Sequence, residues 1–248
     1  CGFVALIGPT NAGKSSLLNA LVGSKLAIVT HKVQTTRTRI RGIAMAGGTQ
    51  IIFADTPGIF KPRRRLDRAM VQAAWGDARD ADIVVLVIDA VRGLNADAQA
   101  IIAGLEKAGR KAVLALNKID LVPREQLLAL AQSFSDLNRF TDVFMISATT
   151  GDGINDLRAH FESALPLGPW LFPEDQLSDA PLRILAAEIT REKLFLRLHQ
   201  ELPYESTVET ESWKAMKGGA VRIDQTIYVS RDSQKPIVLG KGGATIKQ

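Results

Sequence analysis

The segment GPTNAGKS at residues 8–15 constrains the fold more than any other feature of the sequence. It fits the pattern G-x-x-x-x-G-K-[ST], in which glycines let backbone amides turn inward around a phosphate group. The pattern needs a strand before it and a helix after it, because the positive end of the helix then faces the anion. We therefore expect a strand over Phe3–Ile7, a helix starting near Lys14, and a phosphate group between them.

Short aliphatic runs recur over residues 1–165 and alternate with amphipathic stretches. The runs are continuous, as expected for strands in a sheet whose two faces are both covered. We expect these strands at Ile51–Ala54, Ile83–Ile88, Ala112–Leu116 and Val143–Ile146, and a helix face at Ile154, Leu157, Phe161 and Leu165. The alternation predicts an α/β domain with a mostly parallel sheet and helices on both faces.

The motif DTPG at residues 55–58 ends the expected strand Ile51–Ala54. The Asp55 carboxylate can hold Mg²⁺, usually through a water molecule. The Gly58 amide can contact a γ-phosphate, because glycine allows close backbone approach. Lys14 is expected to reach the β and γ phosphates, and the Ser15 hydroxyl is expected to bind the same Mg²⁺.

The motif NKID at residues 117–120 ends a later strand. The Asp120 carboxylate can accept hydrogen bonds from the ring NH and the exocyclic amine of guanine, which adenine does not offer at that edge. A site built around such a contact strongly rejects the analogue that lacks it. Ser147 and Ala148 follow the next strand, and the Ala148 amide can bond the guanine oxygen. The sequence therefore predicts GTP as the ligand rather than ATP.

In this order and spacing, the four motifs are similar to those of the translation-factor-like branch of P-loop GTPases. The resemblance implies that a segment between the phosphate loop and Asp55 carries a Mg²⁺-binding threonine, ordered only when the γ-phosphate is present. Thr36 is our prediction and Thr35 is the alternative. Gly58 is followed by Ile59, where Ras-like relatives place a water-orienting glutamine, so slow intrinsic hydrolysis is expected.

Asn11 lies inside the phosphate loop. In several related bacterial GTPases an asparagine here helps to bind K⁺, so the resemblance implies that K⁺ replaces an arginine finger electrostatically. The alternative is that Asn11 only shapes the loop.

The sequence predicts three overlapping sets of site residues. Lys14, Thr36 and Gly58 are expected to act in hydrolysis, and Ser15, Thr36 and Asp55 are expected to hold Mg²⁺. The residues expected at the nucleotide are Asn11, Ala12, Gly13, Lys14, Ser15, Ser16, Asp55, Gly58, Asn117, Lys118, Asp120, Ser147 and Ala148.

Residues 166–181, PLGPWLFPEDQLSDAP, contain four prolines and one glycine, a composition that predicts a linker. Trp170 and Phe172 are expected to pack on a neighbouring surface. Beyond the linker we expect a strand at Leu182–Ala186, a helix at Glu188–Glu201, and two extended segments, 205–213 and 220–230, around a turn at Lys217–Gly219.

The sequence GKGG at residues 240–243 lies between two apolar stretches. It resembles the G-x-x-G loop of a KH domain, in which Gly240, Gly242 and Gly243 allow close approach to a nucleic-acid backbone and Lys241 meets a phosphate. Together with the GTPase motifs, this loop makes essentially the whole chain similar to the Era family, bacterial GTPases with a C-terminal type II KH domain. Supporting stretches are GPWLFPED at 168–175, EITREK at 188–193 and ELPY at 201–204.

This resemblance implies a P-loop GTPase domain at 1–165, a linker at 166–181 and an α+β KH domain at 182–248. It implies binding to the 3′ end of small-subunit ribosomal RNA rather than to DNA, and a role in assembling that subunit. It also implies a cytoplasmic protein with peripheral association at the inner face of the cell membrane. We expect the natural N terminus and the last KH helix to be missing, because the chain opens on an apolar segment and stops within an element.

Composition excludes several other classes of function. Cys1 is the single cysteine, so no internal disulfide can form. His31, His160 and His199 show no metal-ligand spacing. The longest aliphatic run, Ile83–Ile88, is far shorter than the roughly 18 residues of a membrane span. The net charge of +5 favours an anionic partner.

Two other functions fit parts of the sequence. The second domain could bind protein, with residues 240–243 forming an ordinary turn. Alternatively, the chain could be a nucleotide-dependent scaffold with negligible turnover. RNA binding by variants of the 240–243 loop separates the first alternative, and phosphate release in K⁺ and Na⁺ buffers separates the second.

Overall fold

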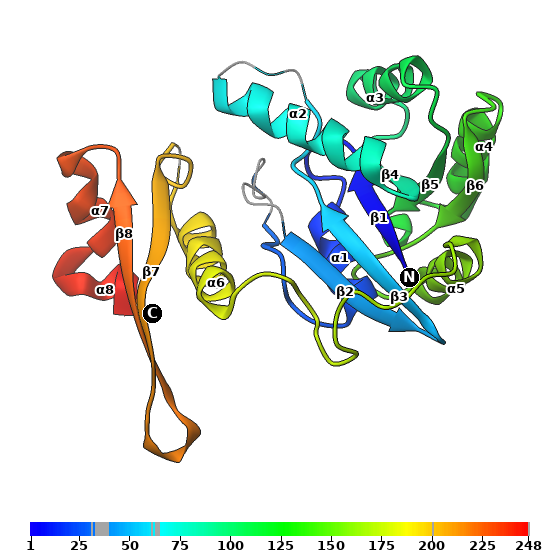
Figure 1. Ribbon diagram of the computed structural model, residues 1–248. Helices are drawn as coiled ribbons and strands as arrows, with labels where there is room; N and C mark the ends of the chain where they lie inside the picture. Colours follow the sequence, from blue (N-terminus) through cyan, green and yellow to red (C-terminus); the bar gives the residue numbers. More distant parts are fainter. Residues whose placement is uncertain (31, 33–39, 61, 63–64, 200, 248) are drawn as a thin grey trace. The chain divides into compact units, whose positions relative to one another are not determined.

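The computed structural model describes residues 1–248 except 31, 33–39, 61, 63–64, 200 and 248, and it describes only the backbone of Leu66 (Figure 1). The described chain forms two compact units. The first comprises residues 1–27 and 33–179, and the second comprises residues 28–32 and 180–248.

The first unit is built on a six-stranded sheet in the order β2-β3-β1-β4-β5-β6 (Figure 1). The strands are β1 (Gly2–Ile7), β2 (Ile40–Ala46), β3 (Thr49–Asp55), β4 (Ile83–Asp89), β5 (Ala112–Asn117) and β6 (Phe140–Met145). Neighbouring strands are parallel except for β2 and β3, which form an antiparallel hairpin. The mostly parallel sheet predicted from the aliphatic runs is confirmed.

Helices cover both faces of this sheet, as predicted. They are α1 (Lys14–Val22), α2 (Arg65–Asp80), α3 (Ala96–Lys107), α4 (Arg124–Ser135) and α5 (Ile154–Ala164). Along β1, Val4 and Leu6 face the cluster formed with α1 and α5, whereas Ala5 and Ile7 face the cluster formed with α2, α3 and α4. Since both faces of each central strand are buried, the strands read as continuous apolar runs.

The strand β2 was not predicted, because Gly42 interrupts its aliphatic run. A Cβ at this position would lie 2.6 Å from Leu18 Cδ1, so the glycine allows α1 to approach the sheet. The predicted start of β6 was also wrong. This strand begins at Phe140, three residues before Val143, and its pairing with β5 shifts register between Ala112 and Leu114.

Gln50 holds the segment that we predicted as a linker, residues 166–181, against the β2–β3 hairpin, and residues 166–179 of this segment belong to the first unit. Its buried side chain accepts hydrogen bonds from the backbone amides of Leu171 (2.9 Å) and Phe172 (3.1 Å), and it donates to the Phe172 carbonyl (2.8 Å). Trp170 donates through Nε1 to the Gly48 carbonyl at 3.1 Å. Trp170 and Phe172 therefore contact the β2–β3 hairpin, as the sequence predicts.

The end of the linker lies along β2. The Ile43 amide donates to the Leu177 carbonyl at 2.8 Å, and Ser178 Oγ donates to the Arg41 carbonyl at 2.8 Å. The Arg41 amide donates to Asp179 Oδ1 at 3.1 Å, and the two side chains form an ion pair at 3.6 Å. The linker thus satisfies part of the exposed edge of β2, where unpaired backbone groups would otherwise invite other chains.

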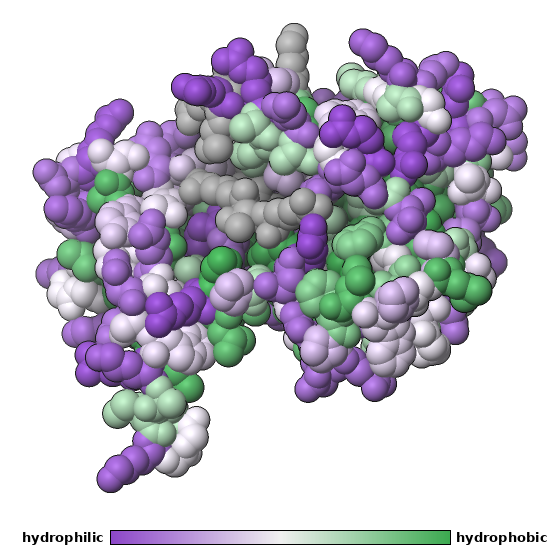
Figure 2. Space-filling view, in the orientation of Figure 1, coloured by the Kyte–Doolittle hydropathy of each residue, from purple (hydrophilic) through white to green (hydrophobic). Residues whose placement is uncertain are grey.

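The second unit packs a helix against a long antiparallel hairpin (Figure 1). Its elements are α6 (Leu182–Arg197), β7 (Ser206–Ala215), β8 (Val221–Val229), α7 (Lys235–Leu239) and α8 (Ala244–Lys247). Its small core contains Leu194, Leu198, Val208 and Val238. The two extended segments are confirmed as β7 and β8, and residues 217–219 form the turn between them. This turn is the tip of the hairpin, which projects beyond the rest of the second unit (Figure 2).

The predicted strand at Leu182–Ala186 is wrong, because these residues form the first turns of α6. Pro181 precedes the helix, and its fixed backbone angle favours a helix start. Leucine and alanine are strong helix formers, so the short aliphatic run does not require an extended strand. The helix also ends earlier than predicted, since Leu198 is already extended (ψ 150°).

Residues 28–32 are part of the second unit although they lie far from it in sequence. The Val29 amide donates to the buried Glu192 carboxylate at 3.1 Å. Lys32 Nζ donates to the carbonyl oxygens of Phe195 and Leu198, at the end of α6. A cation at this position is favourable, because the C-terminal carbonyls of a helix carry partial negative charge.

Candidate functional site

The loop between β1 and α1 has the backbone geometry that a phosphate-binding loop needs. Gly8 (φ 152°) and Gly13 (φ 94°) both adopt positive φ. A Cβ on Gly8 would lie 2.3 Å from the Val87 carbonyl oxygen, and one on Gly13 would lie 2.2 Å from Asn117 Nδ2. Only glycine fits at these positions without a shift of the Val87 backbone or of the Asn117 side chain.

Lys14 begins α1 and is buried, with 6% of its surface exposed. Its Nζ donates to the carbonyl oxygens of Gly8 (3.1 Å) and Pro9 (2.8 Å), which holds the ammonium group inside the loop. Burial lowers the pKa of Lys14 to about 8, although the charge of Asp55 acts in the opposite direction. A buried cation with a lowered pKa is poised to gain stability from a bound anion.

Ser15 and Asp55 meet across 40 residues of sequence. Ser15 Oγ donates to Asp55 Oδ2 at 2.9 Å, and Asp55 is fully buried at the end of β3. Hydroxyl and carboxylate oxygens are hard ligands of the kind that Mg²⁺ prefers. The donor set therefore fits Mg²⁺, as the sequence predicts for these two residues.

Gly58 lies against the phosphate loop. A Cβ added to it would lie 2.9 Å from Thr10 Cγ2 and 3.1 Å from Thr10 Cα. The next amide, that of Ile59, donates to the Gly8 carbonyl at 3.0 Å. Gly58 therefore lies close to the backbone of the phosphate loop, and its contact with a γ-phosphate stays a prediction.

Asn117 ties three predicted segments together. It is 2% exposed, its Nδ2 donates to the Ala12 carbonyl at 2.9 Å, and its Oδ1 accepts from the Ala148 amide at 3.0 Å. The side chain thus positions the phosphate loop and the loop after β6 relative to the end of β5. These hydrogen bonds also stabilise the fold, because leaving the buried Asn117 amide unsatisfied would cost about 1–3 kcal/mol.

Lys118 adopts a left-handed backbone (φ 66°) and joins the same cluster. Its Nζ donates to the Asn11 carbonyl at 2.8 Å and pairs with Asp89 Oδ2 at 2.6 Å. Asp89 was missed in the sequence analysis. A signal was available, because Asp89 ends β4 beside the ends of β1 and β5, and the carboxyl ends of parallel strands share one sheet edge.

The two remaining base-site candidates differ in exposure. Asp120 lies in a single 3₁₀ turn, Ile119–Leu121, and its side chain is exposed. Ser147 is fully buried, and its Oγ accepts from the Thr150 amide at 3.1 Å. Asp120 is therefore available to a ligand, whereas Ser147 shapes the loop that presents Ala148.

The remaining predicted residues are Ser16 and the two threonine candidates. Ser16 is half-buried in the first turn of α1. Thr35 and Thr36, the two candidates for the switch threonine, lie outside the described residues. Within the part of the chain that is described, no group of three or more His, Cys, Asp and Glu side chains could hold a metal ion.

The predicted RNA loop joins α7 to α8. Gly240, Gly242 and Gly243 have positive φ of 73°, 63° and 76°, and Lys241 is exposed. A Cβ on Gly240 would lie 2.3 Å from Thr245 Oγ1, whereas one on Gly242 would meet nothing within 4 Å. The loop therefore exposes Lys241, and no other residue crowds Gly242.

Among the helices that are described, none combines the length and the apolar character required to cross a bilayer.

Sequence models of two families match the chain. Residues 3–118 match the 50S ribosome-binding GTPase family, and residues 201–248 match the KH domain. The first match falls in the first unit except for residues 28–32, and the second match falls in the second unit.

Curated relatives match along nearly the whole chain. GTPase Era of Rhizobium meliloti is 64% identical over 246 residues, which cover 99% of this chain and 79% of that protein. GTPase Era of Afipia carboxidovorans is 63% identical over 247 residues, covering 100% of this chain and 80% of that protein.

Two solved structures have the same fold. One is Era in complex with MgGDPNP and nucleotides 1506–1542 of 16S ribosomal RNA, and it is 35% identical with a TM-score of 0.93. The other, Aquifex aeolicus Era with one substitution, is bound to GDP·AlF4⁻ and has the same identity and TM-score. Each alignment covers 99% of this chain and 84% of the other chain. The chain therefore belongs to the Era family of GTPases.

Proposed function

We propose that this GTPase binds and hydrolyses GTP at the cluster built around Asn117, and that its second unit binds ribosomal RNA through residues 240–243. The observation that carries the first part is the meeting of four separate motifs at one sheet edge. Asn117 bonds the phosphate loop and Ala148, Lys118 bonds Asn11, and Ser15 bonds Asp55.

Within this site, the loop amides and Lys14 bind the phosphates, and Ser15 and Asp55 hold Mg²⁺, which neutralises phosphate charge when bound. Asp120 selects guanine. The Ala148 amide already donates to Asn117, so a guanine oxygen would share this donor. The solved Era structure with MgGDPNP supports the assignment of Mg²⁺. Thr36, or alternatively Thr35, completes the Mg²⁺ ligands.

We propose that GTP hydrolysis is slow when the protein's own side chains act alone. Ile59 is 7% exposed and apolar, so it cannot orient an attacking water molecule. The Gly58 amide can mark the position of the γ-phosphate, but positioning of the water supplies much of the catalysis in GTPases. A further positive charge at the phosphates is therefore needed, and we propose that K⁺ held by Asn11 supplies it.

We expect GTP hydrolysis to be faster in K⁺ than in Na⁺ buffer by about tenfold or more, because a fixed cation stabilises the charge that develops on the phosphates. Asn11→Gly should remove this difference. Asn11 has a φ of 62°, which glycine adopts without strain, so the change removes the side chain and keeps the loop. Phosphate release at saturating GTP is the measurement.

An unchanged K⁺/Na⁺ ratio in Asn11→Gly would show that Asn11 only shapes the loop. Absence of release in both buffers, with GTP still bound, would instead favour the non-enzymatic scaffold. The curated relatives are GTPases, which argues against that outcome.

Nucleotide binding should take up protons around pH 8. The pKa of Lys14 is about 8 in the free protein, and an adjacent phosphate raises it by favouring the charged form. Neutral Lys14 must then gain a proton on binding: about 0.1 proton per site at pH 7 and about 0.5 at pH 8. Affinity for Mg·GDP should therefore fall as pH rises above 8.

Titration calorimetry in buffers of different ionisation enthalpy measures this uptake directly. The exposed Lys111→Met variant is the control, and it should behave as the unchanged protein. Equal uptake at both pH values would contradict the assignment of Lys14.

For the second unit, we propose binding to the 3′ end of small-subunit ribosomal RNA and a role in assembly of that subunit. The support is the KH-domain match at residues 201–248 and the solved Era complex with nucleotides 1506–1542 of 16S ribosomal RNA. We also propose that the protein acts in the cytoplasm. From the family resemblance we further propose a peripheral association with the inner face of the cell membrane.

Lys241→Asp combined with Gly242→Asp is expected to weaken binding of a ribosomal RNA 3′-end oligonucleotide on the order of 10²-fold, because two carboxylates would face the phosphates. The chain offers a matched control in the other Lys-Gly-Gly turn. Gly218 also has a positive φ (78°) and open space around it, so Lys217→Asp with Gly218→Asp makes the same chemical change elsewhere.

The control should retain its RNA affinity, measured by fluorescence anisotropy. If both double variants bind RNA as the unchanged protein does, residues 240–243 form an ordinary turn and the protein-binding alternative is favoured.

A further inference from the structure

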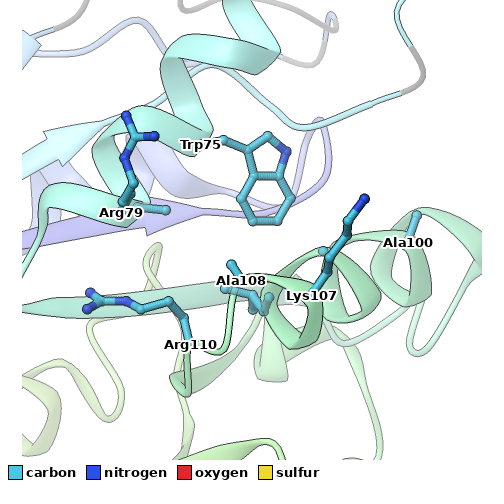
Figure 3. Close-up of a pocket in the computed structure, with 9 residues that line it drawn as sticks. Trp75, Arg79, Ala100, Lys107, Ala108 and Arg110 are labelled. Carbon is cyan, nitrogen blue, oxygen red and sulfur yellow. The ribbon is translucent and has the colours of Figure 1, made fainter.

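A pocket of about 630 Å³ lies between α2 and α3 in the first unit (Figure 3). It is separate from the nucleotide site, because none of its lining residues belongs to the cluster around Asn117. Its volume is in the range of pockets that hold small ligands or single groups of a larger partner. The pocket is lined by Trp75, Ala78, Arg79, Ala100, Gly104, Leu105, Lys107, Ala108 and Arg110.

The floor of the pocket is small and apolar around one aromatic ring. Trp75 is half-buried and packs against the core of its face of the sheet. A Cβ on Gly104 would lie 2.6 Å from two carbons of the indole, so a glycine inside α3 lets the ring lie close to the helix backbone. Alanines beside the ring leave the hollow unfilled.

The rim of the pocket is cationic. Figure 3 shows Arg79 and Arg110 on one side of the Trp75 ring and Lys107 on the other. Arg110 is fixed by a hydrogen bond from Nη2 to the Ala81 carbonyl. Arg79 pairs with Asp80 at 3.5 Å, but both side chains are at least 73% exposed, and such pairs contribute little. Among the described lining residues there is no carboxylate, so the rim favours an anionic occupant.

We propose that this pocket receives one unpaired nucleotide of a single-stranded RNA, with the base against Trp75 and the neighbouring phosphates at Arg79, Arg110 and Lys107. A nucleotide within a strand offers a flat aromatic surface with a phosphate on each side, which matches a ring flanked by cations on both sides. The floor has few hydrogen-bonding side chains, so recognition depends on stacking and charge and tolerates different bases.

This inference extends the proposed RNA-binding function to a second site on the other unit. An acidic protein segment with an apolar anchor would meet the same charges, but it offers no obligatory charge on each side of its anchor. The chain also carries a net charge of +5, as expected of a protein with several nucleic-acid contacts.

The test uses the full chain and a fluorescein-labelled single-stranded oligouridine of about ten nucleotides, within the site sizes of such surfaces. The background is Lys241→Asp with Gly242→Asp, so that binding through residues 240–243 is removed. In that background, Arg79→Glu with Lys107→Glu should reduce the residual affinity at least tenfold. It should also lower the slope of log affinity against log salt by about 1.4, because two phosphate contacts are lost.

The matched control is Arg92→Glu with Arg124→Glu, which makes the same change in net charge at two exposed positions outside the pocket. The control should reduce the affinity by less than the pocket variant. Unchanged GTP hydrolysis and unchanged thermal melting confirm that both variants fold.

Trp75 provides a direct readout. The chain has three tryptophans, so Trp170→Phe with Trp213→Phe leaves Trp75 as the single indole. Oligouridine should quench its fluorescence, and Arg79→Glu with Lys107→Glu should abolish the quenching. The inference fails if the pocket variant and its control bind RNA alike, or if an acidic peptide quenches Trp75 while oligouridine does not. These results leave the 240–243 loop test untouched, so the two proposals fail separately.

Discussion

Asp120→Asn is expected to weaken GTP binding by about 10²- to 10⁴-fold, because two hydrogen bonds to a charged acceptor, worth about 1.5–3 kcal/mol each, are lost or weakened. Asparagine presents one acceptor and one donor, so it fits xanthine, which has a carbonyl where guanine has its amine. The variant should therefore prefer xanthosine triphosphate. Since Asp120 is exposed in a short 3₁₀ turn, the change should leave the fold intact.

Competition binding with GTP, ATP and xanthosine triphosphate measures the change in preference. Asp156→Asn makes the same substitution at an exposed position on α5 and serves as the control. A variant at position 120 that still prefers guanine would refute the assignment of the base site, and with it the reason for excluding ATP.

Lys14→Met is expected to abolish nucleotide binding and to make the nucleotide-free protein more stable. The pKa of Lys14 falls from 10.5 to about 8 on folding, so the charged form is disfavoured in the folded protein. At pH 7 the lysine is charged in both states, and the cost of burying that charge is about 3 kcal/mol. Methionine fills a similar volume without this cost.

The pH dependence follows from the sign of this shift. Between pH 8 and 10.5 the unfolded chain binds more protons at this position than the folded chain does, so the contribution of Lys14 to stability rises with pH. The stabilising effect of Lys14→Met should therefore be largest below pH 8 and should vanish above about 10.5.

Thermal melting with and without Mg·GDP tests both parts. GDP should raise the melting temperature of the unchanged protein and leave that of Lys14→Met unchanged. A variant that melts lower and still responds to GDP would show that Lys14 stabilises the loop rather than the ligand.

The sequence could predict that the candidate site residues lie close together, because several of them follow strands. Asp55 and Asn117 each end an aliphatic run, and the carboxyl ends of parallel strands converge. Asp89 was missed because no motif surrounds it, and its pairing with Lys118 depends on the order of β4 and β5 in the sheet. Strand order is a long-range property that local patterns do not encode.

Local patterns also misassigned elements where packing decided the outcome. Gly42 looks like a strand breaker, yet it is the position at which α1 needs the closest approach to the sheet. The run at Leu182–Ala186 looks like a short strand, yet it continues into a 16-residue helix. In both cases the neighbouring element, rather than the residue's own preference, determines the conformation.

The assignment of residues 28–32 to the second unit bears on how this protein can be divided. Cutting the chain after Asp179 would remove α6, and with it the acceptors of Val29 and Lys32. Those five residues lead directly into residues 33–39, where the switch threonine is expected. In an isolated GTPase fragment, the residues just before the expected switch threonine would therefore lose these hydrogen bonds. We expect the rate of GTP hydrolysis by such a fragment to differ from that of the intact protein.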